Sequence, residues 1–158
     1  MNAIVHLLRQ LEAYVQEEIG AQGRTLALLG AQEDALRSRD PHKITSSTQQ
    51  LERELSSAPR RAQRRQELLA AFARAWDLAP CTLTLSSVVD RAGEEGERLA
   101  RQRNELRAVT ANVARQSRRV AAIARYHESF ATDVLQVLIA VDGGAPFEAG
   151  GVLVDAEA

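Results

Sequence analysis

The sequence has one cysteine, four prolines and few aromatic residues, which make up 4% of its 158 residues. The single cysteine, Cys81, excludes an internal disulfide bond and favours a reducing compartment. No cluster of histidine and cysteine offers a zinc site, and we expect neither a metal nor another cofactor. Because proline and aromatic residues are scarce while Ala, Leu, Arg, Glu and Gln are abundant, the composition predicts an all-α protein.

Two further classes of protein are excluded by charge and by the lack of long hydrophobic runs. The formal net charge is -1, so no overall positive charge attracts nucleic acid or an anionic membrane. No apolar run approaches the roughly 20 residues of a membrane span, and the first residues lack the basic region of a signal peptide. We therefore expect a cytoplasmic protein with no membrane span and no nucleic-acid partner.

Catalytic motifs are missing as well. The three histidines, His6, His42 and His127, lie far apart, and there is no Ser/His/Asp order, phosphate-binding glycine loop or H-E-x-x-H pair. Paired acids such as Glu17 and Glu18 lie on segments typical of solvated helix faces. We expect a protein without enzymatic activity.

Helical periodicity is the main feature that the sequence does contain. Apolar residues spaced by three, four or seven predict a first helix over about residues 2–37. Asp40 followed by Pro41 predicts the start of a second helix, as an N-cap with proline at the first helical position. A third helix is predicted over residues 60–77, and we expect Trp76 to seat it on its neighbours.

A heptad pattern of apolar residues runs from Leu85 to Val141 and predicts a long final helix with coiled-coil packing. An uninterrupted helix of this length would measure roughly 85 Å, although Gly93 and Gly96 stand where they could break it near its start.

The fold that we predict is an elongated antiparallel helical bundle or coiled coil, with three shorter helices packed along the long carboxy-terminal helix. Residues 1–141 form one helical domain. Residues 142–158 contain four glycines, one proline and four acids, and they predict a flexible acidic tail.

The final helix is longer than the helices available to cover it. The first helix, and the second and third together, would each span roughly 50 Å. Part of the heptad seam therefore lacks a cover within the chain, and contiguous exposed apolar residues mark interaction sites. We predict a partner-binding surface formed by Val120, Ile123, Phe130, Val134, Val137 and Leu138.

Two kinds of partner fit an uncovered seam, namely a second copy of the chain or an amphipathic helix of another protein. With a second copy, the chain is a structural coiled-coil scaffold that self-associates through its last helix. The register of that homodimer would be set by the polar seam residues Glu95, Gln102, Gln116 and His127. Both alternatives stay open at this point.

A set of residues punctuates the predicted helices, namely Glu33 or Asp34 with Ala35 and Leu36, then Asp40, Lys43, Leu51, Arg65, Leu68, Leu69, and the L-T-L-S stretch of Leu83, Thr84, Leu85 and Ser86. These residues resemble those of FlgN-like flagellar export chaperones. The similarity covers roughly residues 5–141. One departure is the stretch from Arg115 to Arg119, where the family tends to show paired asparagines.

This resemblance implies a cytoplasmic chaperone that works without a nucleotide. Its substrates would be the hook-filament junction (hook-associated) proteins of the flagellum, held by their helical carboxy-terminal segments. The chaperone would keep them soluble and deliver them to the flagellar type III export apparatus, with export-gate components as further partners.

Overall fold

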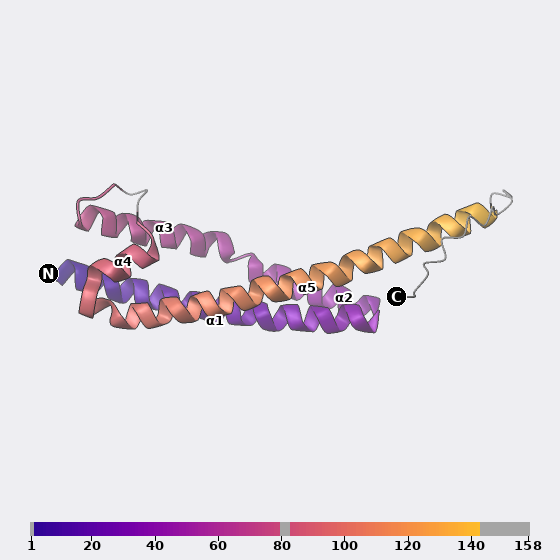
Figure 1. The fold of residues 1–158 in the computed structure, drawn as a ribbon, viewed down its shortest axis with the longest axis horizontal. Helices are drawn as coiled ribbons and strands as arrows, with labels where there is room; N and C mark the ends of the chain where they lie inside the picture. Colours follow the sequence, from indigo (N-terminus) through magenta and orange to yellow (C-terminus); the bar gives the residue numbers. More distant parts are fainter. Residues whose placement is uncertain (1, 80–82, 143–158) are drawn as a thin grey trace, which may run out of the picture.

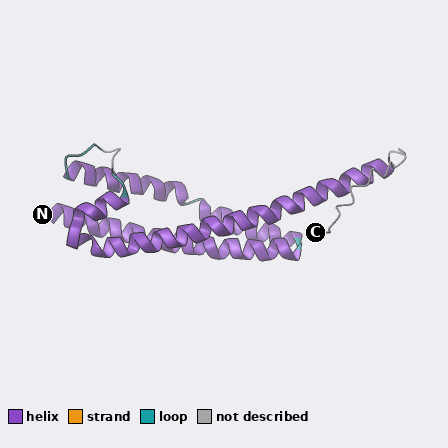
Figure 2. Cartoon of the chain, in the orientation of Figure 1, coloured by secondary structure: helices purple, strands orange, loops and turns teal. Residues whose placement is uncertain are grey.

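The computed structural model describes residues 2–79 and 83–142, and Cys81 and residues 143–158 of the predicted tail lie outside these ranges. The described chain is helical and has no strand, as Figure 2 shows, which confirms the all-α prediction. The elements in chain order are α1 (Asn2–Ser38), α2 (Pro41–Leu55), α3 (Ala58–Ala75), α4 (Leu85–Ala92), the short 3₁₀ helix η2 (Gly93–Gly96) and α5 (Glu97–Asp142).

A tight reversal separates α1 from α2. Arg39 adopts a φ of 54°, in the left-handed region that ends a helix. The Asp40 carboxylate then accepts hydrogen bonds from the backbone N–H groups of His42 and Lys43, at 2.9 and 3.3 Å. Pro41 lies in the first turn of α2, where its missing N–H costs nothing. The predicted cap and helix start are confirmed.

The chain then runs back along α1 through α2 and α3. Gln32 on α1 donates a hydrogen bond to Thr48 on α2 at 3.2 Å, and Glu18 on α1 pairs with Arg61 on α3 at 2.8 Å. Residue numbers fall on α1 as they rise on the other two helices, so α2 and α3 are antiparallel to α1.

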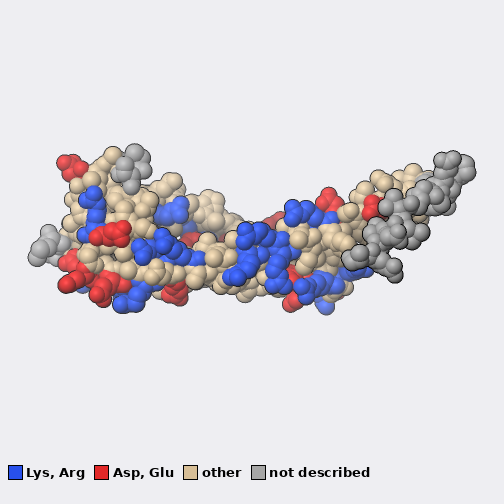
Figure 3. All heavy atoms as spheres, viewed as in Figure 1, with Lys and Arg blue, Asp and Glu red and all other residues tan. Residues whose placement is uncertain are grey.

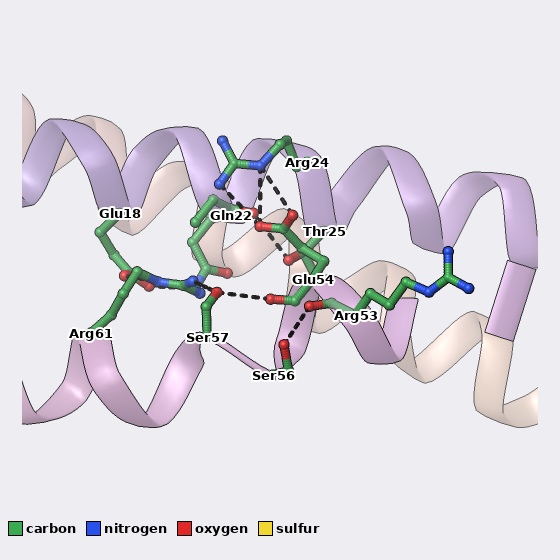
Figure 4. A network of polar contacts seen from close by, with 10 residues as sticks. Glu18, Gln22, Arg24, Thr25, Arg53, Glu54, Ser56, Ser57 and Arg61 are labelled. Atoms are coloured by element: carbon green, nitrogen blue, oxygen red, sulfur yellow. Dashed lines mark hydrogen bonds and ion pairs between the residues drawn. The ribbon is translucent and has the colours of Figure 1, made fainter. Parts of the chain in front are cut away.

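Polar contacts hold the junction between α2 and α3 against α1, as Figure 4 shows. Arg24 on α1 forms an ion pair with Glu54 near the end of α2 at 3.0 Å. At the start of α3, Arg61 donates to the Ser57 hydroxyl. The break at Ser56–Ser57 is therefore fixed on both sides, and α2 and α3 are two helices rather than one bent rod.

Two glycines interrupt the final heptad segment where the sequence allows it. Gly93 ends α4 with a φ of 58°. A Cβ on Gly96 would lie 2.9 Å from the Cβ of Ala92, so only glycine fits this close approach. The long helix proper therefore begins at Glu97 and spans 46 residues, about 70 Å instead of the roughly 85 Å of an unbroken helix.

Helices α1 and α5 lie side by side and run in the same direction. Gln102 donates to Gln16 at 3.1 Å and Arg119 donates to Glu33 at 2.7 Å, and both pairs are 86 residues apart in the sequence. The predicted antiparallel arrangement applies to α1 with α2 and α3. The α1–α5 pair is parallel because the connection through α4 returns the chain to the amino-terminal end of α1, as Figure 1 shows.

The main hydrophobic core lies at this amino-terminal end of the bundle. It joins α1, α3, α4 and the start of α5, and Phe72, Val88 and Leu99 in it are fully buried. The Trp76 ring packs 5.0 Å from the Phe72 ring and has the Arg91 guanidinium 5.9 Å from its centroid. The prediction that Trp76 seats α3 on its neighbours is confirmed.

Candidate partner-binding surface

A second, smaller core covers the middle of the α5 seam. Val120 is 8% exposed and packs with Leu29 and Leu36 of α1, while Ile123 packs against the same cluster. The expectation that Val120 and Ile123 lie on an uncovered seam is therefore wrong. Both residues face the α1–α2 hairpin because the parallel α1 extends this far along α5.

The cover ends where α1 ends. The constant spacing of 86 residues places Ser38, the last residue of α1, beside Ala124. From there to Asp142, α5 extends past the hairpin by about 27 Å at 1.5 Å per residue. Figure 1 shows this segment leaving the bundle.

The protruding segment carries a dense group of exposed apolar side chains. The four remaining residues of the predicted surface lie here, and between 41% and 56% of each side chain is exposed. We call residues 130–139 the bare end of α5; every one of them is exposed. The predicted residues within it are Phe130, Val134, Val137 and Leu138.

Three further exposed apolar residues were not part of the predicted surface. Tyr126 is 64% exposed, Leu135 is 58% exposed and Ile139 is 70% exposed. Leu135 and Ile139 lie outside the heptad seam, so a search for one apolar stripe misses them. The signal was present in the residues from Val134 to Val141, which are apolar on every side except at Gln136.

His127 marks the transition between the covered and the bare parts of the seam. It is half-buried, whereas its neighbours Tyr126 and Glu128 are exposed. The Tyr126 ring contacts the imidazole edge-on, with centroids 6.1 Å apart.

A buried carboxylate fixes α1 to α5 just before the cover ends. Glu33 is 6% exposed, whereas its neighbour Asp34 is exposed. The Glu33 carboxylate pairs with Arg37 at 2.6 Å and with Arg119 at 2.7 Å, and it accepts a hydrogen bond from the Gln116 amide. Of the two acids that the sequence offered for this position, Glu33 is the one that contacts α5.

These contacts also set the ionisation of Glu33. Removal of the carboxylate from water raises its pKa, but the hydrogen bonds from Gln116 and Arg119 and the positive charges of Arg119 and Arg37 outweigh that effect. The pKa of Glu33 is therefore lowered from its ordinary value of 4.5. The group stays ionised at neutral pH and holds α5 in place where its bare end begins.

Neither a metal centre nor a membrane span occurs in the described ranges. No three His, Cys, Asp or Glu side chains gather there as metal ligands would. None of the helices in residues 2–79 and 83–142 combines the length and the hydropathy that crossing a membrane requires.

Comparison with known proteins gives one match. The family model described as FlgN protein matches residues 1–143, which covers all the described helices. No curated protein and no solved structure matches the chain.

Proposed function

Because the chain belongs to the FlgN family, whose role is that of a flagellar export chaperone, we propose that it binds the helical carboxy-terminal segment of hook-associated proteins. It keeps these substrates soluble in the cytoplasm and delivers them to the flagellar type III export apparatus. Components of the export gate are further partners in this scheme.

The observation that carries this proposal is the bare end of α5. Phe130, Val134, Val137 and Leu138 continue the stripe that packs on α1 over the preceding turns. A substrate helix therefore takes beyond Ser38 the place that α1 holds before it, as in other complexes where an amphipathic helix lies in an apolar groove.

The size of this surface suits reversible binding. Burial of the exposed half of a large apolar side chain contributes about 1 kcal/mol. Four such side chains offset part of the cost of association and of ordering a flexible segment. A chaperone that must release its substrate at the export apparatus needs this balance between binding energy and the cost of ordering. Reversible binding of this kind requires no nucleotide.

The test replaces Phe130 and Val134 with aspartate and measures co-purification with hook-associated proteins. We expect binding to be lost while the helical signal in far-UV circular dichroism stays at the wild-type level, because both side chains lie outside the core. The matched control is Leu55→Asp, at an exposed leucine on α2 that is 44% exposed, and it should bind normally. Normal binding by the Phe130/Val134 variant would overturn the assignment of the site.

The alternative of a self-associating scaffold loses part of its support. Gln102 bonds to Gln16, and Gln116 bonds to Glu33, so two of the polar seam residues are used within the chain. Light scattering separates the two functions. A dimer that survives dilution and binds no hook-associated protein would favour the scaffold, whereas a one-to-one complex with such a substrate supports the chaperone.

A further inference from the structure

A row of arginines without acidic partners lies on α5. From Leu106 to His127 this helix has five arginines and no acidic residue. Arg118 and Arg125 are exposed and make no hydrogen bond or ion pair with any described residue. Figure 3 shows Lys and Arg side chains gathered over the middle of the molecule. The molecule thus presents a positive strip although its net charge is -1.

This row faces away from the bundle. Arg118 and Arg125 are seven residues apart, so they share one side of α5. Both are exposed, and at 100° per residue they lie about 160° and 140° around the helix from Val120, which packs on α1. The side is distinct from the seam proposed to bind the export substrate.

A groove continues the row toward the amino-terminal end of α5. It has a volume of about 570 Å³ and lies between the start of α4 and α5. Its apolar lining comes from Leu85, Leu106, Ala111 and Ala114. Because Ala111 precedes Arg118 by seven residues, the groove and the arginine row form one continuous strip.

Arginines also border the groove. Arg103 and Arg107 line it, and the Arg107 guanidinium donates to the Ser86 hydroxyl at 3.0 Å. From Arg103 to Arg125 the strip measures about 33 Å. We call it the outer strip of α5.

We propose that the outer strip of α5 binds an acidic amphipathic helix of a second protein. Apolar side chains of that helix enter the groove at one end, and its carboxylates pair with Arg118 and Arg125 along the rest of the strip. The unpartnered positive charges specify an acidic partner. The strip is separate from the seam, so both partners bind the same molecule at once.

A helix fits the strip better than a lipid surface does. The groove is recessed between two helices, where side chains of a helix can enter but a flat bilayer surface cannot follow. Exposed alanines at 111, 114 and 121 allow a second helix to approach α5 closely, while arginines spaced by seven match carboxylates spaced by one heptad.

The experiment measures fluorescence anisotropy of a labelled peptide of about four heptads, with leucine at the seam positions and glutamate at the flanking positions. Mutual repulsion of the glutamates keeps this peptide from pairing with itself. We expect the full chain to bind it at least roughly tenfold more tightly than the same peptide with lysine in place of glutamate. Equal binding of the two peptides would overturn the proposal.

Charge reversal locates the interaction. The Arg118→Glu/Arg125→Glu variant should bind the acidic peptide roughly tenfold more weakly, because two attractive contacts become repulsive. The Arg9→Glu/Arg53→Glu variant is the matched control, since it changes the charge equally at exposed arginines of α1 and α2 and should leave the affinity unchanged. An equal loss in both variants, or no loss in the first, contradicts the proposed surface.

A second variant tests the groove without altering charge. Ala114→Trp fills the groove from an exposed position of α5, so it should weaken the acidic peptide while circular dichroism stays at the wild-type level. The Phe130→Asp/Val134→Asp variant should still bind this peptide, which separates the outer strip from the substrate site. Loss of the acidic peptide in that variant would place it on the bare end and overturn this inference but not the proposed function.

Two other occupants have their own signatures, and either would overturn the proposal. A second copy of the chain would give a dimer in light scattering that the Arg118/Arg125 reversal dissociates. If the strip bound an anionic membrane instead, the protein would sediment with phosphatidylglycerol vesicles and not with phosphatidylcholine vesicles, and it would not bind the acidic peptide.

Discussion

Val120 and Val134 occupy equivalent positions of one heptad pattern, two repeats apart, yet 8% of Val120 is exposed and 41% of Val134. The sequence of α5 does not change character between them. The neighbour changes, because α1 ends at Ser38 and α2 begins at Pro41. The same amphipathic stripe is thus buried along one part of the helix and exposed, as the proposed binding surface, along the next, because the α1–α2 hairpin covers only the first part.

The largest effect expected from this comparison concerns leucines. Leu99→Ala should lower the free energy of unfolding by about 3 kcal/mol, because Leu99 is fully buried in the main core and alanine leaves a cavity. Leu138→Ala on the bare end should change it by less than about 0.5 kcal/mol. Urea unfolding followed by circular dichroism measures both. Equal losses would mean that the bare end is covered within the chain.

The hairpin tip should show the next largest effect. Asp40→Ala removes the cap of α2 and should cost about 1 kcal/mol of unfolding free energy. Asp133→Ala is the control, since this exposed acid on α5 caps no helix. If both variants have the same unfolding free energy, the Asp40 cap does not stabilise the tip of the α1–α2 hairpin, where the cover of α5 ends.

Glu33 gives a smaller effect that depends on pH. A lowered pKa means that its contacts stabilise the fold fully above the unfolded pKa near 4.5 and lose their effect as the pH falls through the lower folded value. Glu33→Gln should therefore be less stable than wild type at neutral pH, and the gap should narrow below about pH 4.5. Thermal unfolding across this range measures it.

The neighbouring acid supplies the control for that experiment. Asp34→Asn alters an exposed carboxylate of the same helix turn and should follow the wild-type pH profile. If the difference in thermal stability between Glu33→Gln and wild type stays constant down to acid pH, the charge of the Glu33 carboxylate is not what holds α1 against α5.

The smallest effect is expected from removal of the bare end itself. A chain that stops after Ser129 should keep the unfolding free energy of the full chain within about 0.5 kcal/mol, because residues 130–139 are all exposed. It should also lose binding of hook-associated proteins. A marked fall in stability would show that this segment belongs to the fold rather than to the site.

The helix boundaries were predictable from local chemistry. Asp40 and Pro41 predict the start of α2 as its N-cap and first residue. Gly93, which has a positive φ, ends α4 at the position where the sequence offers a glycine that can break the helix. The parallel direction of α1 and α5 was not predictable, because it depends on where the chain returns after α3. The heptad pattern is the same for either direction, so periodicity carries no information about it.

The exposed apolar part of α5 was predicted only in part, for the same reason. Helical periodicity identified the apolar stripe of α5 but not the point at which α1 stops covering it. The predicted surface therefore included Val120 and Ile123, which α1 covers. The point at which the cover ends is set by where α1 stops beside α5. That depends on how the two helices pack, which the sequence of α5 alone does not contain. Leu135 and Ile139 were missed because a seam argument ignores residues on the other sides of the helix.

The turn at Arg39 and Asp40 has a consequence for how such a protein can change. Insertion of seven residues at the end of α1 and seven at the start of α2 would lengthen both helices. The longer hairpin would then cover two more turns of α5, with no change in the sequence of α5. Shortening both helices would uncover more of α5. The dimensions of the proposed docking site are thus adjustable from a loop that is far from it in the sequence, by insertions and deletions rather than by substitutions in the site.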